Sequence, residues 1–327
     1  MFTGVNGPNP PVRILVVRLG AMGDIIHTLP AVASLKQSLP GSHITWAIAP
    51  KWAPLLEGNP FVDRVISIER GSLAALARSR RELQQKPFDF AVDFQGLIQS
   101  ALVASVARPD RIYGFDRSQV REKLAALFYS SYAVSLSKHV VDRNLDLARA
   151  AGAATVLHTF PLPPGEPEQP LPAGDFVLAS PLAGWASKQW PLASYSALAA
   201  RLDRTLGIPL VVNGPPASAD LLSRIEGARR YTSGLPGLID ASRRAAAIVG
   251  VDSGPLHLAA ALEKPGIAIF GPTDPERNGP YGGSLQVLRS PHAVTSYKRR
   301  NEIDRSMREV TVDDVFTALE RQLVHST

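Results

Sequence analysis

The sequence predicts an α/β protein with two doubly wound domains, each built on a parallel sheet covered by helices on both faces. Short apolar runs rich in β-branched residues alternate with helical patterns along the chain, as expected for buried parallel strands. Near the middle, residues 160–174 contain six prolines and two glycines, a composition that no helix or central strand tolerates. The 327 residues are enough for two domains of about 150 residues, each with its own core.

These observations place an N-terminal domain at residues 1–160, a proline-rich linker at 161–174 and a C-terminal domain at 175–327. The leader, Met1 to Pro11, is rich in glycine, asparagine and proline and has neither the basic nor the apolar region of a signal peptide, so we expect it to be floppy. For the last helix, at about 311–324, the pattern also allows packing back on the N-terminal domain.

In the N-terminal half, each expected strand is a short apolar run followed by a turn or a helical pattern. Pro30 is expected to kink the first helix, because a proline inside a helix removes a backbone hydrogen bond. The expected strands cover residues 11–17, 44–48, 64–68 and 88–94, and the expected helices cover 24–39, 73–83 and 97–107.

The same alternation restarts after the linker. The final helix is expected to begin after Thr311, which can cap it, with Asp313 and Asp314 in its first turn. The other expected elements are strands at 176–179, 208–212, 248–251 and 266–270 and helices at 192–206, 219–228 and between the last two strands.

Composition excludes several classes of function. The chain has no cysteine, which excludes disulfides, zinc–cysteine sites and thiol nucleophiles. Its seven histidines show no metal-ligand spacing, so no metal and no cofactor are expected. A net charge of +6 suits anionic substrates or an anionic membrane face, and no aromatic interleaving or motif points to nucleic acid. No apolar run approaches the roughly 18 residues of a membrane span.

The strongest functional signal lies between the strands at 248–251 and 266–270. A helix starts there, with Asp252 or Ser253 as its cap and Pro255 in its first turn. Its N–H groups would face the edge where open α/β sheets bind ligands, which makes an anion site. An ordinary βαβ unit is the alternative; His257 in the first turn and the rigid loop around Thr273 favour a ligand site.

The loop after the first strand, Arg18 to Asp24, is not a dinucleotide fingerprint. Arg18 stands where the first glycine of that fingerprint belongs, and no acidic residue ends the second strand. Asp24 follows this loop at the start of a helix. It is expected either to cap that helix or to act as a general base for an attacking hydroxyl.

Two further loops follow predicted strands. The first, Ser180 to Pro191, contains Gly184 and places Lys188 between two tryptophans, where it either reaches a diphosphate or remains a solvated loop lysine. The second, at Gln95 and Gly96, either hydrogen-bonds a sugar or is a simple turn.

Taken together, these motifs resemble the lipopolysaccharide heptosyltransferases of glycosyltransferase family 9, especially the heptosyltransferase I type. The resemblance runs from about Val12 to Leu323. Its most specific pieces are Met22–Pro30, Asp93–Leu97, Arg121–Tyr129, Lys188–Pro191, Val251–Leu258 and Phe270–Pro275.

The resemblance implies a GT-B fold with a central cleft and an inverting, metal-independent transfer of heptose. The donor would be ADP-L-glycero-β-D-manno-heptose, and the acceptor would be the Kdo/inner-core region of Kdo-lipid A. The resemblance also implies a role for each site residue. Asp24 would be the base. On the donor side, Lys188, Ser253 and Gly254 would hold the diphosphate, Asp252 and His257 would contact the sugar and phosphates, and Gly184 and Thr273 would complete the site. On the acceptor side, Arg121 would bind Kdo, together with Gln95, Gly96 and Arg18. Ser233 would stand where a ribose-binding glutamate is usual.

Two other functions remain open from the sequence, a nucleotide-sugar epimerase and a non-catalytic sugar-nucleotide-binding module. An epimerase needs no acceptor and would leave Asp24 without a role. We expect the protein to be cytoplasmic and peripheral to the anionic inner membrane face of a Gram-negative bacterium, without nucleic-acid partners.

Overall fold

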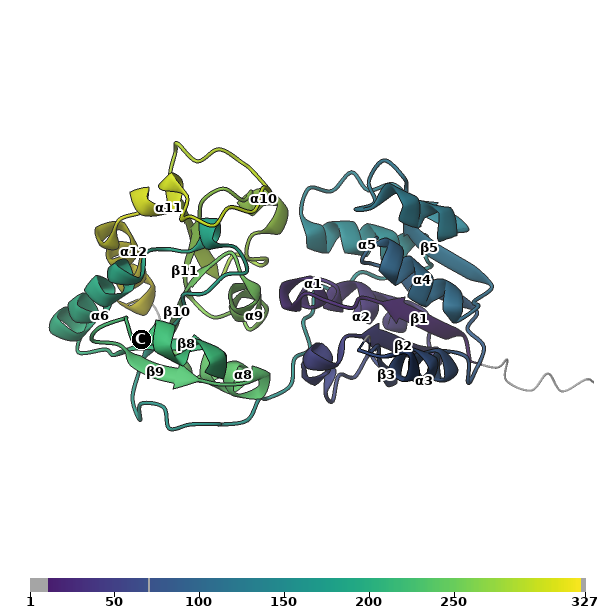
Figure 1. Ribbon diagram of the computed structural model, residues 1–327, viewed down its shortest axis with the longest axis horizontal. Coiled ribbons are helices and arrows are strands. Elements are labelled where there is room, and N and C mark those ends of the chain that lie inside the picture. The colour runs from purple at the N-terminus through teal and green to yellow at the C-terminus, as the bar shows by residue number, and fades with distance from the viewer. Residues whose placement is uncertain (1–10, 70, 325–327) are drawn as a thin grey trace, which may run out of the picture. The chain divides into compact units, whose positions relative to one another are not determined.

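The computed structural model describes residues 11–69 and 71–324, so that most of the predicted leader lies outside the described residues (Figure 1). The chain forms two compact units. The first unit contains the described chain up to Gly20 together with Thr28–Ser137 and Val141–Pro161. The second contains Ala21–His27, Lys138–Val140 and the chain from Leu162 onward. The segment that carries Asp24 therefore belongs, by its contacts, to the second unit.

The first unit is built on a parallel sheet of six strands in the order β3-β2-β1-β4-β5-β6. Because crossovers between parallel strands are right-handed, the reversal of direction after β3 places α2 on one face and α3 and α4 on the other. The elements are β1 (Arg13–Val17), α2 (Leu29–Ser38), β2 (His43–Ile48), η1 (Pro50–Leu56), β3 (Arg64–Ser67), α3 (Leu73–Leu83), β4 (Phe90–Asp93), α4 (Ile98–Val106), β5 (Arg111–Phe115), η2 (Lys123–Phe128), β6 (Ser131–Ala133) and α5 (Val140–Ala150).

Three features of this unit differ from the expectations. The single helix expected at 24–39 is two helices, α1 (Met22–Ile26) and α2, and Pro30 lies in the first turn of α2, where it needs no hydrogen-bond partner. The strands β5 and β6 and the helix α5 were not predicted. Gly114 interrupts β5, and β6 has only three residues, so neither gives a clear apolar run.

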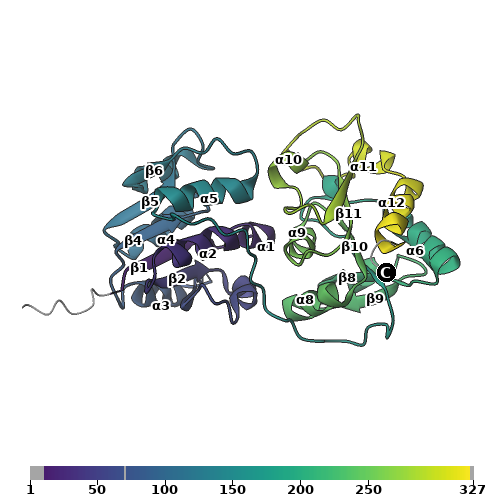
Figure 2. The ribbon, with the colours of Figure 1, turned by 180° about the vertical axis from the view of Figure 1, so that it is seen from behind.

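The second unit repeats the architecture with six parallel strands in the order β12-β11-β10-β7-β8-β9. The helix expected at 219–228 ends at Leu222. Figure 2 shows the same sheet from behind. The elements are β7 (Val177–Ser180), η3 (Ala186–Lys188), α6 (Leu192–Leu206), β8 (Leu210–Gly214), η4 (Pro216–Ser218), α7 (Ala219–Leu222), β9 (Arg229–Thr232), α8 (Leu235–Arg244), β10 (Ala247–Val251), α9 (Gly254–Ala261), β11 (Gly266–Phe270), α10 (Pro275–Asn278), β12 (Leu285–Arg289), α11 (Arg305–Glu309) and α12 (Val312–Val324).

The last helix, α12, packs within the second unit. Its side chains Val315, Phe316 and Leu319 are buried in the core cluster that also contains Val177 and Val249 of the sheet. Packing of α12 on the N-terminal domain, which the sequence left open, stays a prediction. The amphipathic face of α12 is already covered by α6 and the sheet. Thr311 caps the helix as predicted, because its hydroxyl accepts the Asp314 N–H at 3.1 Å.

The proline-rich segment contains no helix or strand, as predicted, but it is tied to the second unit. The Arg243 guanidinium donates to the carbonyl of Leu162 at 2.9 Å. The Glu168 carboxylate accepts the N–H groups of Gly234 and Gly237, both at 2.8 Å, at the start of α8. A carboxylate is favourable there because helix N-termini carry unpaired N–H groups. Among the described helices, none is long and apolar enough to cross a membrane.

Candidate active site

The site is built around α9, which begins at the carboxyl end of the central strand β10. Ser253 occupies the N-cap position and Pro255 lies in the first turn, as predicted. The Ser253 hydroxyl, however, makes no capping bond, and its buried Oγ has no hydrogen-bond partner in the described structure. The same holds for the Oγ1 of Thr273, in the loop after β11. Two buried hydroxyls and a helix N-terminus are therefore available to an anionic ligand.

A buried ion pair lies beside this helix start. Lys188 Nζ is 2.6 Å from Asp252 Oδ2, and His257 Nε2 is 3.6 Å from Asp252 Oδ1. Burial would raise the pKa of Asp252, but the neighbouring His257 imidazole and Lys188 ammonium outweigh it and hold this pKa well below its ordinary value. Asp252 is therefore ionised at neutral pH.

Only one of the two predicted tryptophans holds Lys188. Its ammonium lies 4.4 Å from the centroid of the Trp185 ring, a cation–π contact. Trp190 is instead fully buried in the core, where its Nε1 donates to the Val310 carbonyl at 2.9 Å. The expectation that Lys188 sits between two tryptophans is therefore wrong, because an indole needs both apolar packing and a partner for its N–H. Gly184 is exposed in the same loop.

The short helix α1 approaches α9 very closely. A Cβ atom on Gly23 would lie 2.4 Å from Cδ2 of His257, and a Cβ atom on Gly254 would lie 2.8 Å from the Met22 side chain. Both positions therefore require glycine. Asp24 follows Gly23 directly, so the structure brings the predicted base next to the helix that carries Gly254 and His257.

Asp24 also has the capping role that the sequence left open. Its Oδ2 accepts the Ala21 N–H at 3.2 Å across the first turn of α1. A carboxylate can accept several hydrogen bonds, so this contact is compatible with proton abstraction at another lone pair.

On the predicted acceptor side, the first unit brings the turns after β1 and β4 together. Gln95 Oε1 accepts the Leu19 N–H at 2.7 Å, and the buried Arg18 guanidinium donates to the Phe94 carbonyl. Gly96 adopts φ +67°, and a Cβ atom there would lie 3.3 Å from the exposed Arg121's backbone nitrogen. Arg18 and Gln95 therefore have structural partners, whereas the Arg121 side chain faces solvent beside them.

The protein-family model of glycosyltransferase family 9 (heptosyltransferase) matches residues 76–306, well over half of the chain. The chain belongs to glycosyltransferase family 9. Lipopolysaccharide heptosyltransferase 1 of Pseudomonas aeruginosa is 31% identical, over 85% of this chain and 84% of its own length. The enzyme of that name from Escherichia coli O18:K1:H7 is 29% identical, over 91% and 98% respectively.

The structure of this glycosyltransferase resembles solved family members. The E. coli heptosyltransferase WaaC with ADP matches it with a TM-score of 0.77 at 27% identity, covering 95% of this chain and 100% of that chain. The GT-B fold and the family assignment predicted from the motifs are therefore confirmed, as is the prediction of an enzyme. The family match and the curated relatives favour a transferase over an epimerase or a non-catalytic module.

A feature that the sequence did not reveal lies beneath the turn of Gln95 and Gly96 in the glycosyltransferase. Asp93 is fully buried, and burial raises the pKa of its carboxyl despite several hydrogen bonds. Two side-chain hydroxyls donate to it at 2.8 Å, and two backbone N–H groups donate at 2.9 and 3.2 Å; the donors are Ser100, Tyr129, Gln95 and Gly96. Asp93 thus organises this turn, which only long-range packing could show.

At the position expected for a ribose-binding glutamate, Ser233 is buried and accepts the amide of Asn213 at 2.9 Å. The nearby carboxylate comes instead from Glu168 of the linker, at the start of α8. Ser233 therefore has a structural partner within the second unit.

The histidines of the glycosyltransferase were also not predicted to meet. The ring of His257 lies 4.3 Å from that of His27, which lies 5.6 Å from that of His139, both edge-on. These residues are too far apart in sequence to form a recognisable motif.

Within residues 11–69 and 71–324, no group of three or more His, Asp or Glu side chains is placed to hold a metal ion.

Proposed function

We propose that this glycosyltransferase transfers a heptose from an ADP-heptose to the Kdo/inner-core region of lipopolysaccharide, with inversion and without a metal ion. The observation that carries this proposal is the Lys188–Asp252 pair beside the N-terminus of α9, with the buried hydroxyls of Ser253 and Thr273 left for a ligand. The solved relative with ADP supports an adenosine diphosphate leaving group. The curated relatives, named lipopolysaccharide heptosyltransferase 1, support the heptose and the acceptor class.

In this mechanism, Asp24 takes the proton of an acceptor hydroxyl as its oxygen attacks the anomeric carbon. The new glycosidic C–O bond forms while the bond from the anomeric carbon to the diphosphate oxygen breaks. A single displacement of this kind inverts the anomeric centre. Lys188 and the N–H groups at the start of α9 stabilise the negative charge that develops on departing ADP. Asp252 and His257 orient Lys188 and contact the sugar and phosphates.

For the acceptor, the exposed Arg121 supports recognition of the acidic Kdo sugar. Its side chain stands beside the turn of Gln95 and Gly96, in the unit that does not carry α9. Guanidinium groups bind carboxylates in two-point contacts, and Kdo carries a carboxylate. The proposal places the other predicted acceptor-side residue, Arg18, behind this surface as a support.

We also propose that the enzyme acts in the cytoplasm, on the anionic inner membrane face of a Gram-negative bacterium. The first unit exposes a run of apolar side chains around η2 and β6, 55–95% exposed, and the Tyr132 hydroxyl joins the two segments by donating to the Ala126 carbonyl at 3.4 Å. Arg121 and Lys123 flank the run, and basic residues beside apolar ones suit an anionic lipid surface. The run consists of Leu124, Leu127, Tyr132, Val134 and Leu136.

A single-turnover assay with ADP-, UDP- and GDP-sugars and Kdo-lipid A, read by mass spectrometry, tests the reaction. The proposal requires heptosylated acceptor and free ADP, and only when the acceptor is present. Conversion of the donor sugar without acceptor would support an epimerase, and tight ADP binding without transfer would support a binding module.

For the membrane proposal, sedimentation with anionic vesicles should fall when Leu127 is replaced by Glu. Unchanged sedimentation would contradict a role of the apolar run in membrane binding.

A further inference from the structure

A long connection between β12 and α11, residues 291–303, has no helix or strand of its own; we call it the strap. Two backbone hydrogen bonds fix its course. The Ser296 N–H donates to the Pro272 carbonyl at 2.7 Å, and the Asp304 N–H at its far end donates to the Ser187 carbonyl at 3.3 Å. Pro272 precedes Thr273 and Ser187 precedes Lys188. The strap therefore joins two loops of the donor side.

Side chains hold the strap in the same place. The Arg289 guanidinium donates to Thr295 at 2.9 Å, and Arg277 lies 5.0 Å from the Tyr297 ring centroid. The Arg299 guanidinium carbon lies 5.5 Å from the Trp185 ring centroid, the same ring that Lys188 contacts at 4.4 Å. One indole thus positions two cations from segments more than a hundred residues apart.

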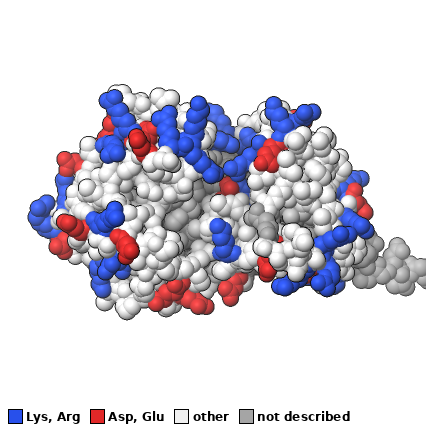
Figure 3. Space-filling model, viewed as in Figure 1, with Lys and Arg blue, Asp and Glu red and all other residues white. Residues whose placement is uncertain are grey.

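The two cations differ in whether an acidic side chain neutralises their charge. Lys188 is paired with the buried Asp252, so this pair has almost no net charge before a ligand binds. Arg299 and its neighbour Lys298 have no acidic partner in the described parts of the chain, and both are exposed. Figure 3 shows basic side chains gathered at the top of the second unit, where α10, α11 and the strap lie in Figure 1.

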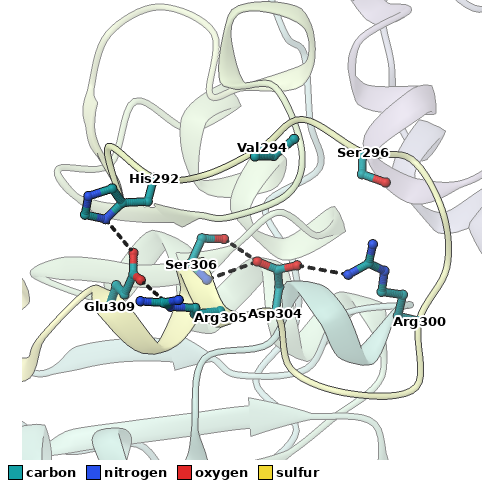
Figure 4. A pocket seen from close by; sticks show the side chains of 8 residues that line it. All are labelled: His292, Val294, Ser296, Arg300, Asp304, Arg305, Ser306 and Glu309. Carbon is teal, nitrogen blue, oxygen red and sulfur yellow. Dashed lines mark hydrogen bonds and ion pairs between the residues drawn. The ribbon is translucent and has the colours of Figure 1, made fainter.

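The cavity beneath the strap is not where this charge is used. It has a volume of about 480 Å³, and its charged side chains pair with other residues that line it (Figure 4). Glu309 lies 3.2 Å from His292 and 2.9 Å from Arg305, and Asp304 accepts the Ser306 hydroxyl at 2.6 Å. These pairs secure the base of the strap and leave Lys298 and Arg299 to the donor side.

We propose that the strap forms one wall of the donor site and that Arg299, supported by Lys298, binds the diphosphate of the sugar nucleotide. This inference rests on the proposed function. A diphosphate carries more negative charge than the Lys188–Asp252 pair and the start of α9 neutralise, and guanidinium groups bind phosphate oxygens in two-point contacts. The Trp185 ring contacts both cations, at 4.4 and 5.5 Å from its centroid, and this shared contact is the reason to assign both to one diphosphate.

Calorimetric titration of the full-length protein with ADP, inorganic pyrophosphate and adenosine tests this inference. Arg299→Ala should raise the Kd for ADP and for pyrophosphate about tenfold or more and leave adenosine binding unchanged, because only the phosphates lose a charge-assisted contact. Arg299→Lys should restore part of the affinity. The matched control is Arg204→Ala, an exposed arginine in the last turn of α6, at the opposite edge of the sheet, which should leave every Kd unchanged.

The outcomes separate the two proposals. An Arg299→Ala protein with wild-type melting temperature and unchanged Kd for ADP and pyrophosphate would overturn the role of the strap and leave the proposed donor intact. If the wild type binds pyrophosphate but not ADP, and Arg299→Ala weakens pyrophosphate binding, the role of the strap is supported and the ADP donor fails. If the wild type binds neither ADP nor pyrophosphate, both proposals fail.

Discussion

Lys188 Nζ lies 2.6 Å from Asp252 Oδ2, and the two side chains are 16% and 6% exposed. This pair joins the loop after β7 to the loop after β10, at the edge where α9 begins. A lysine held in this way is preorganised for an anionic ligand, because no side-chain entropy remains to be lost on binding. The ion pair also stabilises the fold, so replacing the lysine should change both the affinity for ADP and the free energy of unfolding.

The first prediction separates the effect of Lys188 on ADP binding from its effect on stability. Lys188→Ala should weaken ADP binding by about one to two decades and destabilise the fold by about 3 kcal/mol, because the buried Asp252 loses its ammonium partner and keeps the more distant His257. Lys188→Ala combined with Asp252→Asn should recover most of the melting temperature but not the affinity. Calorimetry and thermal unfolding measure the two effects. An unchanged Kd for ADP in Lys188→Ala would make Lys188 a purely structural residue.

The lowered pKa of Asp252 predicts a pH dependence of stability. Its pKa in the folded protein lies below the value of about 3.9 in the unfolded chain, so the carboxylate stabilises the fold above pH 4. That contribution is lost as the pH falls below 4 towards the folded-state pKa. The difference in melting temperature between wild type and Asp252→Asn should therefore be constant at pH 5–7, by this reasoning, and shrink below about pH 4. A difference that grows in acid would contradict this assignment.

Asp24→Asn should separate catalysis from folding. Asparagine keeps an oxygen that can accept the Ala21 N–H, and it caps helices well, so the variant should melt within a few degrees of wild type. A positioned base is worth about 10²–10⁴ in rate, so turnover should fall at least about a hundredfold, with ADP-heptose binding unchanged. Near-normal turnover in a folded Asp24→Asn enzyme would refute its role as the base.

Asp93→Asn should have the opposite profile. The Ser100 and Tyr129 hydroxyls donate hydrogen bonds to the carboxylate, and an asparagine NH₂ group cannot accept them. We therefore expect a loss of about 1–3 kcal/mol in the free energy of unfolding. Turnover of the folded fraction should stay within a few-fold of wild type. Tyr129→Phe, which removes one of the four donors, is the control and should cost less. If Asp93→Asn were stable but a hundredfold slower, Asp93 would replace Asp24 as the candidate base.

Transfer should survive chelation. In the proposed mechanism, Lys188 and the start of α9, together with Arg299 of the strap, supply the positive charge that a metal ion would otherwise bring to the leaving diphosphate. Turnover in excess EDTA should therefore equal turnover in untreated buffer, measured by ADP release with Kdo-lipid A as acceptor. Loss of activity that magnesium or manganese restores would show that the proposal of metal-free transfer is wrong.

Local patterns in the sequence were sufficient for four of the six strands of the second sheet and for the position of the predicted donor loops, whereas β9 and β12 were not predicted. The limits of α6 and α3 were predicted to the residue, because each is a regular amphipathic repeat bounded by loop residues. The short apolar strands β10 and β11 identified the carboxyl edge of the sheet, where we predict the anion site, because helices that follow parallel strands begin there. Strand β6 was not predicted, because three residues are too few to show an alternation of apolar and polar side chains.

The tertiary structure decided which of these loops meet and which residues serve only the fold. Lys188 and Asp252 are 64 residues apart, and Glu168 reaches Gly234 across 66. No local pattern encodes such pairs, because they depend on the path of the whole chain. For the same reason, the sequence did not show that Arg18 and Asp93 are buried, at 5% and 0% exposed, beneath the turns that they hold. A residue type specifies its chemistry, whereas its burial and partners, which long-range packing sets, determine whether that chemistry reaches a ligand.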